Sequence, residues 1–229
     1  MTIVVLHGAG STGLAARRLL GLTDQRDVIT VEDRTGDVGD IVHRLESAVT
    51  SIEHCTEIIG VSLGAHALIT WASGRVDCPP LTCVLPAWTG APSSGAAATA
   101  RAAADIARSG IHGVVASLPA DPSLSDVAAL VRVAWADYSD DELQSCLTTA
   151  SRGHGPSERQ LGSVAGGVRV LGWYGDAFHP PAVAVTWSRL IPHARIAMAA
   201  RPSIRLLGQA RASLRWPSRP RTRPPGAAA

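Results

Sequence analysis

One serine in this sequence stands in a pattern that can expose a nucleophile. Ser62 is the centre of a Gly-x-Ser-x-Gly motif with Gly60 and Gly64 at its ends, and an apolar run leads into it. Where such a motif joins a strand to a helix, the chain turns within about one residue, and the serine Oγ projects above the end of the strand. An ordinary glycine-rich turn can have the same residues, so the neighbouring motifs decide between the two interpretations.

A glycine-rich turn after the first apolar run could serve the same chemistry. The turn consists of His7, Gly8, Ala9 and Gly10. In acyl transfer, backbone N–H groups stabilise the negatively charged oxygen of the tetrahedral intermediate, and one comes from the residue after the nucleophile. We therefore predict Ala9 and Leu63 as the oxyanion donors, and we expect His7 and Gly8 to lie beside the substrate. A phosphate-binding loop is the competing interpretation, and an acid such as Glu32 does not by itself establish it.

A carboxylate downstream of the serine adds a third part. Asp176 lies in the turn after the apolar residues 168–173. A carboxylate at the carboxyl end of a strand can orient a catalytic imidazole. Asp176 also suits an Asx turn or a helix N-cap, because Pro180 and Pro181 can begin a helix after it. Both roles are compatible.

Short β-rich runs alternate with helical stretches along much of the chain. The predicted strands are residues 3–6, 27–31, 57–61, 81–85, 168–173 and 195–199, and the predicted helices are residues 38–51, 63–73, 181–190 and 204–214. This alternation predicts the α/β class, with a mostly parallel sheet and helices on both of its faces.

The alternation of strands and helices stops in the middle of the chain, where an alanine-rich stretch replaces it. Helical patterning there covers residues 96–108, 125–136 and 140–150. An insertion at this point would lie over the carboxyl ends of the strands, where open α/β sheets bind ligands. The predicted parts are a core of residues 1–89 and 168–214, a helical lid of residues 90–167 and a disordered Pro/Arg tail of residues 215–229. A second independent domain is the alternative to a lid, but so alanine-rich a segment would form a thin core.

The charge distribution argues against a nucleic-acid partner. The 229 residues have a formal net charge of +2, but five of the 21 basic residues are arginines after residue 210, where no acid occurs. Residues 1–210 contain the other 16 arginines and all 19 acids, so their net charge is negative. The body of the protein therefore lacks the basic surface that nucleic acid requires. Because no residue is lysine, Schiff-base and P-loop chemistry are also excluded.

Metals, cofactors and membranes have no clear signal either. The four cysteines form no Cys-x-x-Cys pair and the eight histidines have no metal-ligand spacing, so we predict no disulfide framework, no metal site and no cofactor. The first residues resemble a strand, without a basic leader or an apolar segment of about eighteen residues. We expect a cytoplasmic protein that acts on a small molecule and has no membrane partner.

Together these motifs resemble the α/β-hydrolase superfamily, and within it the small esterases, enol-lactonases and cofactor-free haloperoxidases. The resemblance spans most of the chain and rests on His7-Gly8, Asp33-Arg34, Gly60 to Gly64, Pro86-Ala87-Trp88, Gly175-Asp176 and His179-Pro180. It implies the α/β-hydrolase fold, with Ser62 as the nucleophile and Asp176 as the acid of a catalytic triad.

The sequence departs from this family at the general base, which the family carries on a histidine after the final strand. No histidine follows His193, and a serine without a base is a poor nucleophile at neutral pH. His179 would reach Ser62 only through an unusual loop path, because it lies three residues after Asp176. His154, where the helical lid rejoins the core, could swing over the site.

Two further residues have both a functional and a structural interpretation, and a third has a structural one. Arg201 stands roughly where the family has its histidine, and it could pair with Asp176 or hold a substrate carboxylate, or simply be a surface arginine. Trp88 is predicted to line the substrate pocket, with core packing as the alternative. His66 follows Ser62 by four residues, and we expect it in the core.

Two functions follow from these motifs. The first is a serine hydrolase that forms an acyl-enzyme on Ser62 with a small ester, lactone or thioester. The second is a hydrolase-like protein without a complete triad, which would act as a non-hydrolytic catalyst, such as a cyclase or isomerase, or as a binding protein in a biosynthetic pathway.

Overall fold

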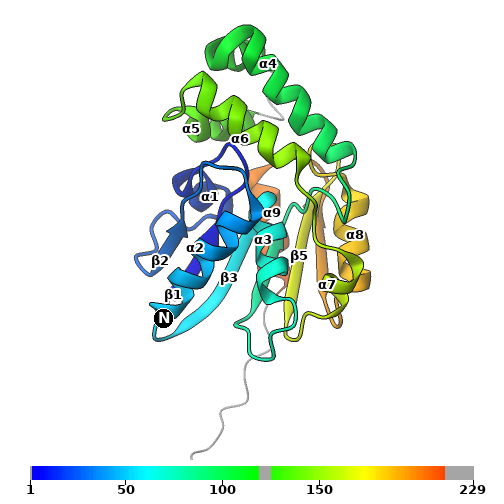
Figure 1. Cartoon of the computed structure of the whole chain (residues 1–229). Coiled ribbons are helices and arrows are strands. Elements are labelled where there is room, and N and C mark those ends of the chain that lie inside the picture. Colours follow the sequence, from blue (N-terminus) through cyan, green and yellow to red (C-terminus); the bar gives the residue numbers. More distant parts are fainter. Residues whose placement is uncertain (1, 119–124, 215–229) are drawn as a thin grey trace, which may run out of the picture.

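A parallel sheet forms the centre of the molecule (Figure 1). The computed structural model describes residues 2–118 and 125–214, and within these ranges six strands pair in the order β2-β1-β3-β4-β5-β6, all parallel. The strands are β1 (Thr2–Leu6), β2 (Val28–Val31), β3 (Cys55–Val61), β4 (Leu81–Val84), β5 (Val168–Trp173) and β6 (Arg195–Ala199). Because the strands are parallel, their carboxyl ends meet at one edge of the sheet. The predicted tail of residues 215–229 lies outside the described residues.

Helices cover both faces of this sheet. On one face lie α1 (Gly13–Leu20) and α9 (Ile204–Ser213), and on the other lie α2 (Val38–Thr50), α3 (Leu63–Ala72) and α8 (Pro181–Leu190). Successive strand residues point to opposite faces, so Val5 clusters with Leu207 of α9, whereas Val4 clusters with Leu45 of α2. The predicted α/β arrangement is therefore confirmed.

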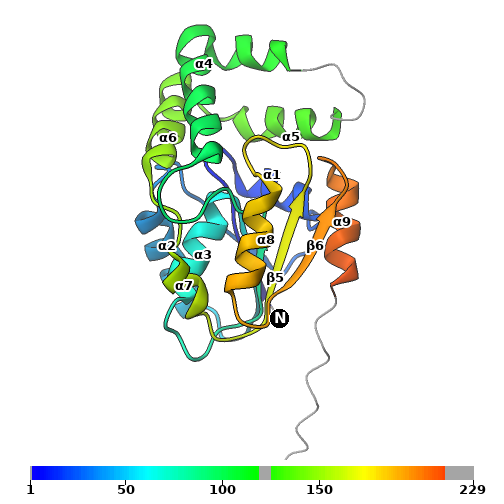
Figure 2. The ribbon, with the colours of Figure 1, turned by 90° about the vertical axis from the view of Figure 1, so that its right-hand side faces the viewer.

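Three helices lie over the carboxyl ends of the strands (Figure 1, Figure 2). They are α4 (Ser94–Ser117), α5 (Ser125–Trp135) and α6 (Asp140–Arg152), and we refer to them as the helical segment. Helix α4 breaks at Gly110, whose φ of 65° is not helical, and it packs along α6. Helix α7 (Glu158–Gly162) packs instead against α3 and α8. No helix in the described ranges is both long and apolar enough to cross a bilayer.

Most predicted element boundaries agree with the structure, but α1 and α7 are not predicted and α4 is longer than predicted. Helix α1 has only eight residues, too few for an apolar stripe to be visible in the sequence. Its end signals are nevertheless present. Thr12 accepts from Ala15 N–H as the N-cap, and Gly21 ends the helix in the left-handed conformation, with a φ of 66°.

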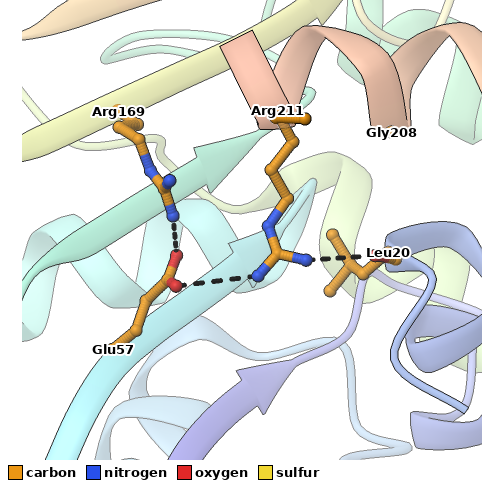
Figure 3. A pocket seen from close by; sticks show the side chains of 6 residues that line it. Leu20, Glu57, Arg169, Gly208 and Arg211 are labelled. Carbon is orange, nitrogen blue, oxygen red and sulfur yellow. Dashed lines mark hydrogen bonds and ion pairs between the residues drawn. The ribbon is translucent and has the colours of Figure 1, made fainter. Parts of the chain in front are cut away.

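A buried ion cluster ties α9 to the amino-terminal half of the strands (Figure 3). The carboxylate of Glu57 accepts from Arg169 and Thr82, and it lies 3.6 Å from the Arg211 guanidinium of α9. Arg211 also donates to Leu20 O at the end of α1, at 3.1 Å. Burial lowers the pKa of Arg169, although contact with Glu57 opposes this effect. The Glu57 carboxylate therefore lies against two guanidinium groups, and all three side chains line a shallow surface pocket.

We expect Glu57→Gln to destabilise the protein by about 3 kcal/mol, because both guanidinium groups lose their buried counter-charge. Urea denaturation measures the free energy of unfolding. Glu53→Gln is the matched control, since the Glu53 side chain is 91% exposed and its loss should leave stability unchanged. Equal stabilities for the two variants would contradict this account of the cluster.

Candidate active site

Ser62 lies between β3 and α3 in a backbone conformation that L-residues rarely adopt. Its φ is 54° and its ψ is −116°. The residues around it must be small: a Cβ at Gly60 would lie 2.4 Å from Gly64 O, and a Cβ at Gly64 would lie 2.6 Å from Leu6 O. The serine is therefore held in a strained, crowded turn at the carboxyl edge of the sheet, which is the geometry of a nucleophile elbow.

An imidazole bridges Ser62 and Asp176. His179 Nε2 lies 2.9 Å from Ser62 Oγ, and His179 Nδ1 lies 2.6 Å from Asp176 Oδ2. A proton on Nδ1, donated to the carboxylate, leaves Nε2 free to accept the serine hydroxyl proton. These three side chains thus have the mutual geometry of a Ser-His-Asp triad.

Hydrogen bonds to the Asp176 carboxylate hold the loop of residues 174–180 in its conformation. Asp176 Oδ1 accepts from Phe178 N–H at 2.7 Å, an Asx turn that brings the chain back over the serine. Asp176 Oδ2 accepts from the indole N–H of Trp173 at 2.7 Å. Gly175 makes the preceding bend possible with a φ of 83°. This curled loop is the unusual path that His179 needs.

These contacts keep Asp176 ionised. Burial by itself raises the pKa of this carboxyl group, but the charge of His179 and the hydrogen bonds from His179, Trp173 and Phe178 N–H outweigh it and lower the pKa to about 2. Asp176 therefore carries its negative charge at any pH where the imidazole can act as a base.

The predicted oxyanion turn lies directly against the serine. A Cβ at Gly8 would lie 2.9 Å from Ser62 Cβ. Gly8 O accepts from Ser11 N at 3.2 Å and lies 2.8 Å from His7 Nδ1, so both contacts hold the peptide that joins Gly8 to Ala9. Because a peptide is planar, fixing its carbonyl also fixes the direction of the Ala9 N–H.

The two N–H groups predicted as oxyanion donors make no hydrogen bond within the described residues. Within residues 2–118 and 125–214, neither Ala9 N–H nor Leu63 N–H has an acceptor. His7 is 4% exposed, and its Nε2 accepts from Asp33 N–H at 3.0 Å. Both ring nitrogens of His7 are therefore engaged with the backbone, which suits a residue that supports the turn.

The same turn has the spacing Gly-x-Gly-x-x-Gly, completed by Gly13, which the phosphate-binding interpretation requires. The structure does not favour that interpretation. Gly13 N–H donates to both carboxylate oxygens of Glu32, at 3.0 and 3.1 Å, and Gly10 N–H donates to Cys146 Sγ. The Glu32 carboxylate therefore already occupies the start of α1.

Two other predicted residues lie apart from the triad. His154 is exposed in the loop before α7. Arg201 is exposed after β6, whereas the Asp176 carboxylate is bound by other groups. Among the described residues it is therefore His179, and not His154, that contacts Ser62 Oγ, and Arg201 forms no ion pair with Asp176.

Trp88 and His66 pack together beneath the site. Trp88 is 2% exposed, and its indole N–H donates to Gly153 O at 3.2 Å. His66 is fully buried, as expected, and its Nε2 accepts from the backbone N–H of Ala87 and Trp88 at 3.3 and 3.4 Å. Burial, and then the charge of His179, lowers the pKa of His66 to about 3, which keeps it neutral.

Sequence reasoning missed the roles of two side chains. The indole N–H of Trp173 donates to Asp176, and its place at the end of β5 is a signal that could have indicated this contact. Cys146 Sγ accepts from Gly10 N–H across 136 positions of sequence, and no local signal in the sequence indicates this contact. In the described part of the chain, no group of three or more His, Cys, Asp and Glu residues could hold a metal ion.

No protein-family model matches the sequence, and no curated protein matches it significantly. Solved structures do match. The enol-lactonase from Burkholderia xenovorans LB400 aligns with a TM-score of 0.69 and 16% identity, covering 93% of this chain and 88% of that chain. A carboxylesterase structure from Nitrososphaera gargenis gives 0.69 and 15%, covering 93% and 86%. MenH from S. aureus gives 0.68 and 16%, covering 91% and 89%.

These structures define the class of the fold. The alignments cover more than nine-tenths of this chain, and its central sheet is parallel with helices on both faces, so this chain has the α/β-hydrolase fold. At such low sequence identity the likeness establishes the fold, and the chemistry has to be argued from the site itself.

We expect Gly64→Ala to destabilise the protein by about 1–3 kcal/mol, because the new Cβ would overlap the backbone carbonyls of Leu6 and His7. Gly208→Ala is the control. Nothing lies within 4 Å of a Cβ at Gly208 in α9, so its helix should gain about 0.5–1 kcal/mol. Thermal unfolding of both variants measures the difference, and a stable Gly64→Ala variant would contradict the tight elbow.

Proposed function

We propose that this protein is a serine hydrolase that acts on a small ester, lactone or thioester through an acyl-enzyme on Ser62. The observation that supports the proposal is the pair of contacts made by His179, 2.9 Å to Ser62 Oγ and 2.6 Å to Asp176 Oδ2. The proposal needs no metal or cofactor, because the nucleophile, base and acid are all side chains of this chain.

In the acylation step for an ester, Ser62 Oγ attacks the carbonyl carbon while its proton passes to His179 Nε2. The tetrahedral intermediate then collapses, the carbon–oxygen bond to the leaving group breaks, and the leaving oxygen takes the proton from His179. Asp176 remains ionised throughout and stabilises the transient imidazolium. The products are the free alcohol and the acyl-enzyme.

Deacylation repeats these steps with water. A water molecule attacks the acyl carbon and gives its proton to His179 Nε2. When the bond to Ser62 Oγ breaks, the proton returns to the serine and the carboxylic acid leaves. In both halves the negative oxygen would be held by Ala9 N–H and Leu63 N–H, and loss of one such donor typically costs about a hundredfold or more in kcat.

The structural neighbours are consistent with this chemistry but do not define the substrate. They include proteins described as an enol-lactonase, an esterase and carboxylesterases. A small-molecule substrate fits that group. The reason to consider a non-hydrolytic catalyst or a binding protein was the lack of a base, and the position of His179 supplies a candidate for it.

A serine-directed fluorophosphonate should label wild-type protein at Ser62 and fail to label Ser62→Ala, as read by intact mass. His179→Ala should lower ester turnover on the order of 10⁴-fold or more, because the hydroxyl loses its base. The control is His43→Ala, since His43 is exposed on α2. An unlabelled, folded wild-type protein would favour the non-hydrolytic alternative. Loss of labelling in His154→Ala but not in His179→Ala would overturn the assignment of the base.

Asp176→Asn should lower kcat on the order of 10⁴-fold while the fold is retained, because the amide favours the wrong imidazole tautomer.

The Asp176→Asn substitution should also change how the free energy of unfolding depends on pH. The pKa of Asp176 falls from 3.8 to about 2 on folding, so its contribution of roughly 2 kcal/mol is present above about pH 4 and is lost as pH falls toward 2. The difference in unfolding free energy between wild type and Asp176→Asn should therefore shrink between pH 6 and pH 3. A constant difference would contradict the low pKa.

A further inference from the structure

We propose that Cys146 and Tyr138, which belong to the helical segment, are positioning residues that hold the oxyanion turn in its working conformation. The inference rests on the proposed function and extends it. It also implies that α6 is a fixed wall of the site, so that α6 does not open as part of a mobile lid. Three sets of contacts support it.

The first contact is between Cys146 and the turn itself. Gly10 N–H donates to Cys146 Sγ at 3.4 Å. This N–H belongs to the peptide directly after the one that carries Ala9 N–H, so the sulfur restrains rotation of the backbone beside the proposed donor. Cys146 is 1% exposed, and burial raises its pKa to about 11. It therefore stays a neutral thiol at physiological pH.

The second contact comes from the residue that precedes α6. Tyr138 OH donates to Ser11 O at 3.0 Å. Ser11 N–H in turn donates to Gly8 O, which closes the turn. Burial is the largest cause that raises the pKa of Tyr138, so the hydroxyl keeps the proton that it donates. Tyr138 and Cys146 thus both hold the backbone that directly follows Ala9.

The third set of contacts is close packing between α6 and both neighbouring loops. Gly10 has a φ of 61°, and a Cβ there would lie 2.7 Å from Leu143 and 3.0 Å from Leu147. In the loop after β2, a Cβ at Gly36 would lie 2.2 Å from Cys146 O. In Figure 1, α6 crosses above the strands that these loops follow. Lifting α6 would therefore break the Gly10 contact and expose both leucines.

The proposed positioning role predicts which kinetic constant should change when these contacts are lost. A loosened turn still admits substrate, but Ala9 N–H then points less often at the developing negative charge. The loss should therefore fall on kcat, with KM nearly unchanged. Because the donor itself remains, we expect about a tenfold loss, below the cost of removing a donor outright.

Cys146→Ala tests the proposal against Cys83→Ala. Cys83 is also fully buried, but it lies within β4, in the core cluster that packs on α2, α3 and α8. Each variant removes one buried sulfur atom from the packed interior of the protein. We expect Cys146→Ala to lower kcat for an ester, and the rate of fluorophosphonate inactivation, about tenfold at nearly constant KM. Cys83→Ala should lose stability but keep both rates.

Two further measurements distinguish a change in the turn from a general folding defect in Cys146→Ala. Hydrogen exchange of the Gly10 amide should be faster in Cys146→Ala than in wild type, and unchanged in Cys83→Ala. Tyr138→Phe removes only the hydroxyl, and it should also lower kcat while KM is retained. Wild-type rates in both Cys146→Ala and Tyr138→Phe would overturn the inference and leave the proposed function intact. Failure of the reagent to label wild-type Ser62 would overturn both.

Discussion

The hydrogen bond between His179 Nδ1 and Asp176 Oδ2 is the interaction on which the candidate site depends. It fixes the imidazole tautomer, turns Nε2 toward Ser62 Oγ, and contributes to the low pKa of the carboxyl group. The same carboxylate also accepts from Phe178 N–H and the Trp173 indole. One buried charge therefore shapes the loop and orients the base.

The oxyanion side of the site is built in a different way. Two crowded turns, at Gly8 and at Ser62, are pressed together, so the position of each depends on the other. His7 supports the first turn from the sheet side, and Cys146 supports it from the helical segment. Core and helical segment thus both support the turn that carries the proposed oxyanion donor Ala9, and mutations in either should affect its conformation.

Much of this arrangement can be read from the sequence because it is encoded locally. The elbow at Ser62 and the acid at Asp176 are predictable, since each sits at a fixed offset from an apolar strand. The place of His179 is not, because it depends on an Asx turn and a glycine with positive φ acting together. The contact between Gly10 and Cys146 is not predictable either, since it joins residues 136 positions apart that have no shared pattern.

The placement of acid and base on one short loop has a mechanical consequence. In the family that the chain resembles, the two groups come from separate loops, so three segments must stay in register with one another. Here the Asp176–His179 contact is internal to four residues and includes no side chain of β6. For the proposed mechanism, only one long-range relation, from this loop to Ser62, has to be preserved. The segment after β6 could then change its sequence without removing a group of the proposed proton path.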